Sequence, residues 1–127
     1  MKRTIRTDKA PAPFQGAPYS QAVVHGDLVF AAGQIGVDPD TGQVVEGGIE
    51  AQTHQAMKNL AAVLEAAGSS LSNALNVSIF IVDFDDFPAM NEVYAEYVGP
   101  DFPARATVQI AGLPSGALVE IALVAHT

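Results

Sequence analysis

The sequence predicts a single α+β domain, in which a mixed β-sheet carries two helices packed on one face. Segments rich in β-branched residues open and close the chain, and two longer segments between them repeat their apolar residues with a helical period. Glycine or proline separates most of these segments. A chain of 127 residues builds one hydrophobic core rather than two, so we expect residues 1–127 to form one domain.

Three short strands are expected in the first third of the chain. Thr4–Thr7 is the first of them. Ser20–Val24 and Leu28–Ala32 flank His25-Gly26-Asp27, which is typical of a tight hairpin.

Two segments predict amphipathic helices. The first runs from Ile49 to Ala67, and Gly68 after it is a typical helix-ending residue. The second begins after Asp85 or Asp86 and ends before Gly99-Pro100. Apolar residues line one side of each: Ile49, Ala56, Met57, Leu60, Val63, Leu64 and Ala67 in the first, and Phe87, Met90, Tyr94, Tyr97 and Val98 in the second.

Three further strands complete the predicted sheet. Ala74–Val82 lies between the helices, and about Ala104–Ile110 and Ala117–Ala125 flank a turn at Leu113-Pro114. The order is therefore β-β-β-α-β-α-β-β. The face without helices keeps apolar residues that nothing in the chain covers, which favours self-association.

Charge is scarce and unevenly placed, and it excludes several classes of partner. The formal net charge is −8, and four of the six cations lie within the first nine residues. Without a basic stripe, nucleic acid and anionic membranes are unexpected partners. We find no export signal and no apolar run long enough to span a bilayer, so we expect a cytoplasmic protein. The chain has no cysteine, which excludes disulfides and thiolate chemistry.

Metal-binding patterns are weak. The segment Asp38–Gly42 begins like a calcium loop, but its glycine comes one place early and position twelve is Ile49. The three histidines, His25, His54 and His126, are far apart in the sequence. We expect no metal site.

Arg105 and Glu120 are charges that the apolar pattern does not explain. After Lys9 the only cations are Lys58 and Arg105, and Glu120 interrupts a nine-residue apolar strand. A carboxylate in that setting costs several kcal/mol unless it is partnered or hydrated. A guanidinium binds a carboxylate through two hydrogen bonds. Apolar surroundings raise the pKa of a glutamate, which suits general acid–base work.

The pairing of the last two strands decides whether these charges meet. If the strands pair antiparallel, Thr107 lies opposite Glu120, and Arg105 and Glu120 become diagonal neighbours roughly 7–8 Å apart. Such a gap fits a small ligand with a carboxylate. Alternatively, the two charges pair with each other or with a neighbouring chain, and the residues alone give these interpretations equal weight.

Three other residues are weaker candidates for a site. Tyr19 stands at a strand start, where core packing is the commoner role of tyrosine. Gly33 is either a strand bulge or a place where a ligand meets the backbone. Asn91 on the second helix is more often a solvated or capping amide.

Several motifs resemble the Rid family, also called YjgF or L-PSP. The C-terminal signature is matched by Phe102-Pro103-Ala104-Arg105-Ala106-Thr107-Val108, Leu113-Pro114 and Val119-Glu120-Ile121. Earlier matches are Ala17-Pro18-Tyr19-Ser20-Gln21, Ala32-Gly33-Gln34-Ile35 and Ala51-Gln52-Thr53-x-Gln55-x-x-x-Asn59-Leu60. They run over essentially the whole chain in the family's order. The presence of Arg105 makes the chain most similar to the RidA branch of reactive-imine deaminases.

The resemblance implies a homotrimer of chorismate-mutase-like domains with three clefts between subunits. It also implies hydrolysis of 2-imino acids and enamines, such as 2-aminoacrylate, 2-iminopropanoate and 2-iminobutanoate, to 2-keto acids and ammonia, without a cofactor. By motif, Arg105 would bind the substrate carboxylate, and Glu120 would position or activate water. The pocket would be lined by Tyr19, Gly33, Asn91 and Thr107.

This sequence departs from the family at the pocket, and other functions remain open. Thr107 replaces the usual cysteine, Ala32 the usual serine and Ala17 the usual glycine. A non-catalytic sensor of 2-keto acids would use the same Arg105. An endoribonuclease or translation inhibitor of the L-PSP type is disfavoured by the acidic charge. A pericyclic mutase should need more than one cation in the cleft, so it ranks last.

Overall fold

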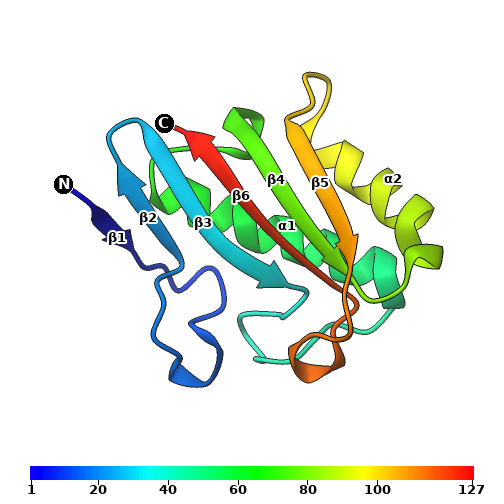
Figure 1. Ribbon diagram of the computed structural model, residues 1–127. Helices are drawn as coiled ribbons and strands as arrows, with labels where there is room; N and C mark the ends of the chain where they lie inside the picture. Colours follow the sequence, from blue (N-terminus) through cyan, green and yellow to red (C-terminus); the bar gives the residue numbers. More distant parts are fainter.

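A six-stranded mixed sheet forms the body of the computed structural model, which describes residues 1–127. Its spatial order is β1-β2-β3-β6-β4-β5. Helices α1 (Gly48–Ala66) and α2 (Phe87–Val98) both lie on one face, as predicted (Figure 1). The strands are β1 (Arg3–Ile5), β2 (Ala22–His25), β3 (Leu28–Ile35), β4 (Ala74–Ile81), β5 (Ala104–Gln109) and β6 (Val119–His126). Short 3₁₀ turns are η1 (Phe14–Gly16), η2 (Leu71–Asn73), η3 (Phe84–Asp86) and η4 (Pro114–Gly116).

Local sequence signals explain the element ends. The predicted hairpin at His25-Gly26-Asp27 is present, but His25 pairs with Leu28, so the turn itself is only Gly26 and Asp27. Gly26 has the positive φ of 59° that such a turn favours. Gly68 has φ 80° directly after Ala67, the C-terminal cap of α1, which is the conformation expected of a helix-ending glycine. Asp86 precedes α2 without a side-chain cap, whereas the Asp83 carboxylate accepts the Asp85 N–H.

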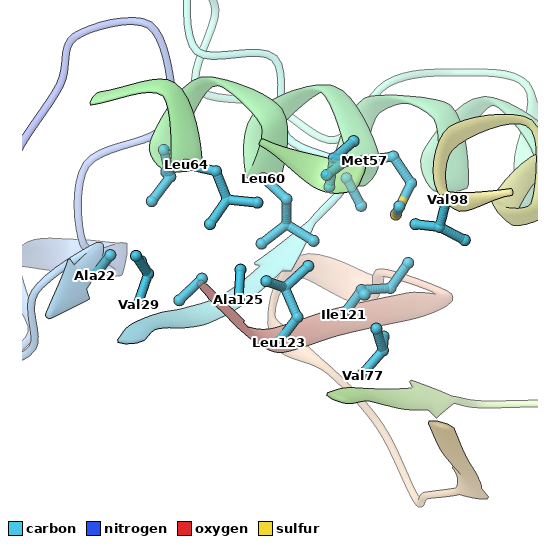
Figure 2. Close-up of a cluster of buried hydrophobic side chains, with 14 of the residues drawn as sticks. Ala22, Val29, Met57, Leu60, Leu64, Val77, Val98, Ile121, Leu123 and Ala125 are labelled. Atoms are coloured by element: carbon cyan, nitrogen blue, oxygen red, sulfur yellow. The ribbon is translucent and has the colours of Figure 1, made fainter. Parts of the chain in front are cut away.

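The core lies between α1 and the sheet. Figure 2 shows Met57, Leu60 and Leu64 of α1 pointing toward Ile121 and Leu123 of β6. These five side chains are all at most 3% exposed. Burial of each large apolar side chain contributes about 1.5–3 kcal/mol before entropy is counted. The predicted apolar stripe of α1 is therefore confirmed, and it fixes which face of the central strands points away from the helices.

The predicted pairing of the last two strands is wrong. β4 lies between β5 and β6, pairing parallel with β5 and antiparallel with β6. The segment β4–α2–β5 is a crossover unit, which places its two strands side by side and parallel. The chain then passes the end of β4, where Ile110 N–H donates to Ile81 O and Val82 N–H donates to Leu118 O. β6 thereby enters the sheet between β3 and β4.

The face opposite the helices is open and partly apolar, as expected. Phe30 on β3 is 46% exposed and Val108 on β5 is 47% exposed. β5 also leaves one edge unpaired, because it is the last strand of the sheet. Neither helix combines the length and apolar character that crossing a bilayer requires.

Candidate functional site

A cleft of ≈ 750 Å³ opens where β3 ends and β6 begins. Two loops flank it, one carrying η1 and the other η4, and both lie at the lower end of the sheet in Figure 1. Glu120 is the only carboxylate among its lining residues. These residues are Pro11, Ala12, Pro13, Phe14, Gln15, Ala17, Tyr19, Ala32, Gly33, Gln34, Ile35, Val37, Pro39, Gly42, Pro114, Ser115 and Glu120.

Glu120 projects from the open face of the sheet into this cleft. It alternates with the buried residues Val119 and Ile121 along β6. Its carboxyl group packs directly against Gly33: a Cβ added to Gly33 would lie 2.7 Å from Glu120 Cδ and 2.8 Å from Oε2. Gly33 lies where the β3–β6 register shifts, so it is a bulge residue. It is also the residue against which the Glu120 carboxyl group packs. Burial raises the pKa of Glu120 above its usual value.

Tyr19 lies in the same cleft. Its hydroxyl oxygen accepts a hydrogen bond from Phe14 N–H at 2.8 Å, which fixes the ring beside the cleft. The hydroxyl proton is not used in that bond, so it can be donated to a ligand. Of the residues that the sequence singled out, the structure therefore brings Tyr19, Gly33 and Glu120 together.

Two left-handed turns border the cleft, and the sequence analysis missed them. Gln15 in η1 has φ 52° and Ser115 in η4 has φ 57°. Such backbone is unusual for residues other than glycine, asparagine and aspartate, and it costs on the order of 1 kcal/mol or more for each residue. Each is followed by a glycine with positive φ, Gly16 and Gly116. The pairs Gln15-Gly16 and Ser115-Gly116 were the only available signals.

Arg105 belongs to a second group of residues, on α2 and β5. Its guanidinium carbon lies 5.0 Å from the ring centre of Tyr94 and 5.5 Å from that of Phe87. Cations over aromatic faces gain about 0.5–1 kcal/mol at exposed sites and more when desolvated. Sequence analysis assigned both rings only to the apolar stripe of α2 and did not anticipate that they hold Arg105.

Three polar atoms of this second group are buried without a hydrogen-bond partner in the chain: Asn91 Oδ1, Tyr94 OH and Thr107 Oγ1. Thr107 follows Arg105 by two positions on β5, and so points to the same side. Asn91 lies one turn from both Phe87 and Tyr94 on α2. Burial raises the pKa of Tyr94, and Arg105 opposes that shift only in part, so its phenol stays neutral. Buried polar groups are nearly always paired, so partners from outside the chain are expected here.

The two groups do not meet within one chain, which corrects the predicted juxtaposition of Arg105 and Glu120. Arg105 is in register with Val77, which is buried against the helices, whereas Glu120 is in register with Phe80 on the open face. The two charges are therefore on opposite faces, two strands apart and three positions apart along the strands. This offset is about 10 Å in each direction within the sheet. No ligand as small as an imino acid could touch both in a single subunit.

The structure has no group of three or more His, Cys, Asp or Glu side chains placed to hold a metal ion. Asp38–Gly42, which starts like a calcium loop, folds as a turn in which Gly42 N–H donates to Asp38 O. The Asp38 side chain also accepts the Asp40 N–H.

Comparison with known sequences identifies close relatives over nearly the full length. Residues 7–127 match the family model described as endoribonuclease L-PSP. A RutC family protein of Pyrococcus horikoshii is 48% identical over 99% of this chain and 98% of its own length. The human 2-iminobutanoate/2-iminopropanoate deaminase is 42% identical over 98% of this chain and 90% of its own length.

Solved structures of similar proteins have the same fold. The crystal structure of RidA from an Antarctic Psychrobacter superposes with a TM-score of 0.93 at 42% identity, covering 98% of this chain and 99% of the other. Escherichia coli TdcF with bound serine superposes with a TM-score of 0.90 at 35% identity, covering 98% of each chain.

Proposed function

Because the chain belongs to the endoribonuclease L-PSP family, also called the Rid or YjgF family, we propose that it hydrolyses reactive 2-imino acids and their enamine tautomers to 2-keto acids and ammonia. Relatives named for 2-iminobutanoate and 2-iminopropanoate deamination support this activity. The serine-bound structure of TdcF supports a ligand that carries an amino acid's carboxylate. The proposed reaction needs no cofactor.

The observation that carries the proposal is the environment of Glu120. It is the only carboxylate lining a cleft large enough for a small molecule, and burial raises its pKa. A glutamate whose pKa is raised is a better proton acceptor from water than one with the usual pKa. Because Gly33 has no side chain, the carboxyl group can lie directly against the backbone of β3.

The proposed site is completed by a second copy of the chain. One copy supplies Glu120, Tyr19 and Gly33, and the other supplies Arg105, Asn91 and Thr107. The unpaired edge of β5, the partly apolar open face and the unpartnered polar atoms beside Arg105 support this assembly. Since each chain carries both groups, cyclic association of three copies gives a homotrimer with three clefts between subunits.

Substrate binding follows from the chemistry of Arg105. The substrate carboxylate accepts two hydrogen bonds from the guanidinium, which remains charged at any relevant pH. Thr107 and Asn91 lie beside this position, and Tyr19 donates its hydroxyl proton from the other subunit. When the substrate carboxylate is bound to Arg105, the imine carbon lies in front of Glu120. Water held by Glu120 is then oriented for attack on that carbon, which lowers the entropic part of the barrier.

Hydrolysis then proceeds in two steps. The substrate reacts as its iminium form, which an imino acid reaches by taking a proton from solvent at nitrogen and an enamine by taking one at its terminal carbon. Water attacks the iminium carbon, a C–O bond forms, the C=N π electrons move to nitrogen, and Glu120 accepts the water proton. The tetrahedral carbinolamine then collapses: Glu120 returns its proton to nitrogen, the C–N bond breaks, and ammonia leaves. The proton of the remaining hydroxyl passes to the departing ammonia. The products are the 2-keto acid and ammonium, and Glu120 ends as the carboxylate that it was at the start.

Ammonia release from 2-iminobutanoate generated in place tests the proposal against the uncatalysed rate. We expect the protein to accelerate release and Glu120→Gln to lower kcat about a hundredfold or more, from the lower end of the range typical of losing a general base. A 2-keto acid should still bind that variant, and the oligomer should persist in light scattering. Glu65→Gln, which alters an exposed carboxylate of α1, is the matched control.

The alternatives give different results in the same assay series. A protein that binds 2-keto acids but does not accelerate release would be a sensor. Cleavage of an added RNA without ammonia release would favour an endoribonuclease. Normal turnover by Glu120→Gln, or a monomer at micromolar concentration, would contradict the proposed site.

A further inference from the structure

Helix α1 presents two buried amide side chains to the walls of the Glu120 cleft. Gln52 is 6% exposed and Asn59 is 1% exposed. Both belong to the segment Ala51–Leu60 of α1, to which the reaction above assigns no role. Because buried amides are costly unless they are paired, their partners indicate what they do.

Gln52 holds the strand that carries Glu120. Its Oε1 accepts a hydrogen bond from Leu118 N–H at 2.8 Å, across 66 positions of sequence. Leu118 immediately precedes β6 and stands two residues before Glu120. Its carbonyl oxygen is bound to Val82 N–H. Gln52 therefore supplies the partner for the Leu118 N–H at the point where β6 enters the sheet.

Asn59 holds the opposite wall. Its Nδ2 donates to Val37 O at 2.8 Å and to Ile35 O at 3.3 Å. Ile35 and Val37 line the cleft, and Ile35 is in register with Glu120. Between them Gly36 passes so close to α1 that an added Cβ would lie 2.7 Å from the Cα of Gln52. Both walls of the cleft are thus fixed to the same helix.

A neighbouring residue separates this arrangement from ordinary helix packing. Thr53 is also completely buried, but its hydroxyl donates to Ile49 O within α1, at 2.7 Å. Thr53 stabilises its own helix, whereas Gln52 reaches the backbone of Leu118, two residues before Glu120.

We propose that Gln52 is a positioning residue for imine hydrolysis: through Leu118 it fixes the start of β6 and so holds the Glu120 carboxylate over Gly33. This inference rests on the proposed function, because it assigns Gln52 to the base of that reaction. Substrate affinity depends on Arg105, on another strand and from another copy, so Gln52 acts on kcat rather than on KM.

The first test compares three variants of the full-length protein. Gln52→Ala should lower kcat for 2-iminobutanoate roughly 10- to 100-fold, the range expected when a reacting group moves by about 1 Å, with KM changed less than about twofold. Gln52→Glu keeps an oxygen acceptor at the same reach and should recover most of kcat. Thr53→Val, which removes a buried hydroxyl of similar depth, should keep kcat. Unchanged kcat in Gln52→Ala, no recovery in Gln52→Glu, or an equal loss in Thr53→Val would overturn the proposal.

The pH profile separates positioning from misfolding, because a smaller folded fraction lowers the apparent kcat without shifting the pH of its acid limb. The residues beside Glu120 on β3 and β4, namely Gly33, Ile35 and Phe80, are uncharged, and Tyr19 is the other titratable group that lines the cleft. The second copy adds Arg105, which keeps its charge at any relevant pH in both proteins. Release of Glu120 toward water in Gln52→Ala should therefore shift the acid limb of kcat to lower pH. An acid limb at the wild-type pH would contradict the proposal.

If wild-type protein does not accelerate ammonia release, the proposed function fails, and the role of Gln52 is decided separately. Carbon-13 NMR of the Glu120 carboxyl group then reports its pKa directly. A lower pKa in Gln52→Ala than in wild type would support positioning, and an unchanged pKa would overturn it.

Discussion

Arg105→Ala is the most informative single change, because it separates ligand binding from assembly. In the free chain the guanidinium contacts the faces of Tyr94 and Phe87. Removing two cation–π contacts costs about 1–2 kcal/mol of folding stability. A marginal loss of this size leaves the domain folded at 25 °C.

The loss of activity should be larger. Two charge-assisted hydrogen bonds to a carboxylate are worth about 1.5–3 kcal/mol each, so removing them should cost about 3–5 kcal/mol in kcat/KM after the usual losses from imperfect geometry. That corresponds to a fall of about 10²- to 10⁴-fold. Arg105→Lys should recover little, because an ammonium cannot make the planar two-point contact.

The assay is kcat/KM for ammonia release, with molar mass measured by light scattering on the same samples. Lys58→Ala, which removes an exposed cation of α1, controls for the change in net charge and should behave as wild type. Wild-type kcat/KM in Arg105→Ala would refute the carboxylate role. Dispersal of the oligomer with activity lost in proportion would instead assign Arg105 to assembly.

Three further predictions follow from the cleft and the β5 edge. Thr107→Cys should keep imine hydrolysis within a fewfold of wild type, since this position is expected to contribute mainly backbone, and a large gain in rate would contradict that. Gly33→Ala should lower kcat at least tenfold by displacing Glu120, because its methyl would lie 2.7 Å from the carboxyl carbon; a crystal structure with Glu120 unmoved would refute this. Because the pKa of Glu120 is raised, wild-type kcat should fall as pH drops through that pKa, and Glu120→Gln should lack this acid limb.

Linkage gives the same carboxyl group an opposite effect on stability. A carboxyl pKa raised by folding means that the native state binds the proton more tightly than the unfolded state does. The stability contributed by Glu120 therefore falls as pH rises from its unfolded to its folded pKa, and it stays low above that window. The raised pKa that suits Glu120 to accept a proton therefore lowers the stability of the folded state above that pH window, as is common at functional sites.

The sequence predicted the elements well because their causes are local. The apolar stripe of α1 follows the helical period, and Gly68 and the turn at Gly26-Asp27 have backbone preferences of their own. The pairing of β5 with β4 has no local cause. The long connection between β5 and β6 permits either a hairpin of these two strands or a β6 that lies on the far side of β4. Only the packing of α2 on the sheet decides between the two arrangements. Arg105 and Glu120 were consequently placed on the same face in the prediction.

The two candidate charges were found from sequence for one physical reason, and their surroundings were missed for another. A charge inside an apolar strand stands out against its neighbours, whereas the groups that hold it come from distant segments. Arg105 is held by two rings of α2, and Glu120 by the backbone of Gly33. Neither set of contacts leaves a periodic pattern in the sequence from which it could be predicted.

Apolar contacts also explain why both charges stay available for a ligand. An ion pair would fix Arg105 by consuming its N–H donors, and a substrate carboxylate would have to displace the partner. The rings of Tyr94 and Phe87 restrain the guanidinium through its face, which leaves the donors at its rim free. Glu120 is likewise restrained by packing against Gly33, and burial is the cause of its raised pKa. A site built in this way positions both side chains without pairing them, so Arg105 stays free to bind a ligand's carboxylate and Glu120 stays free to accept a proton.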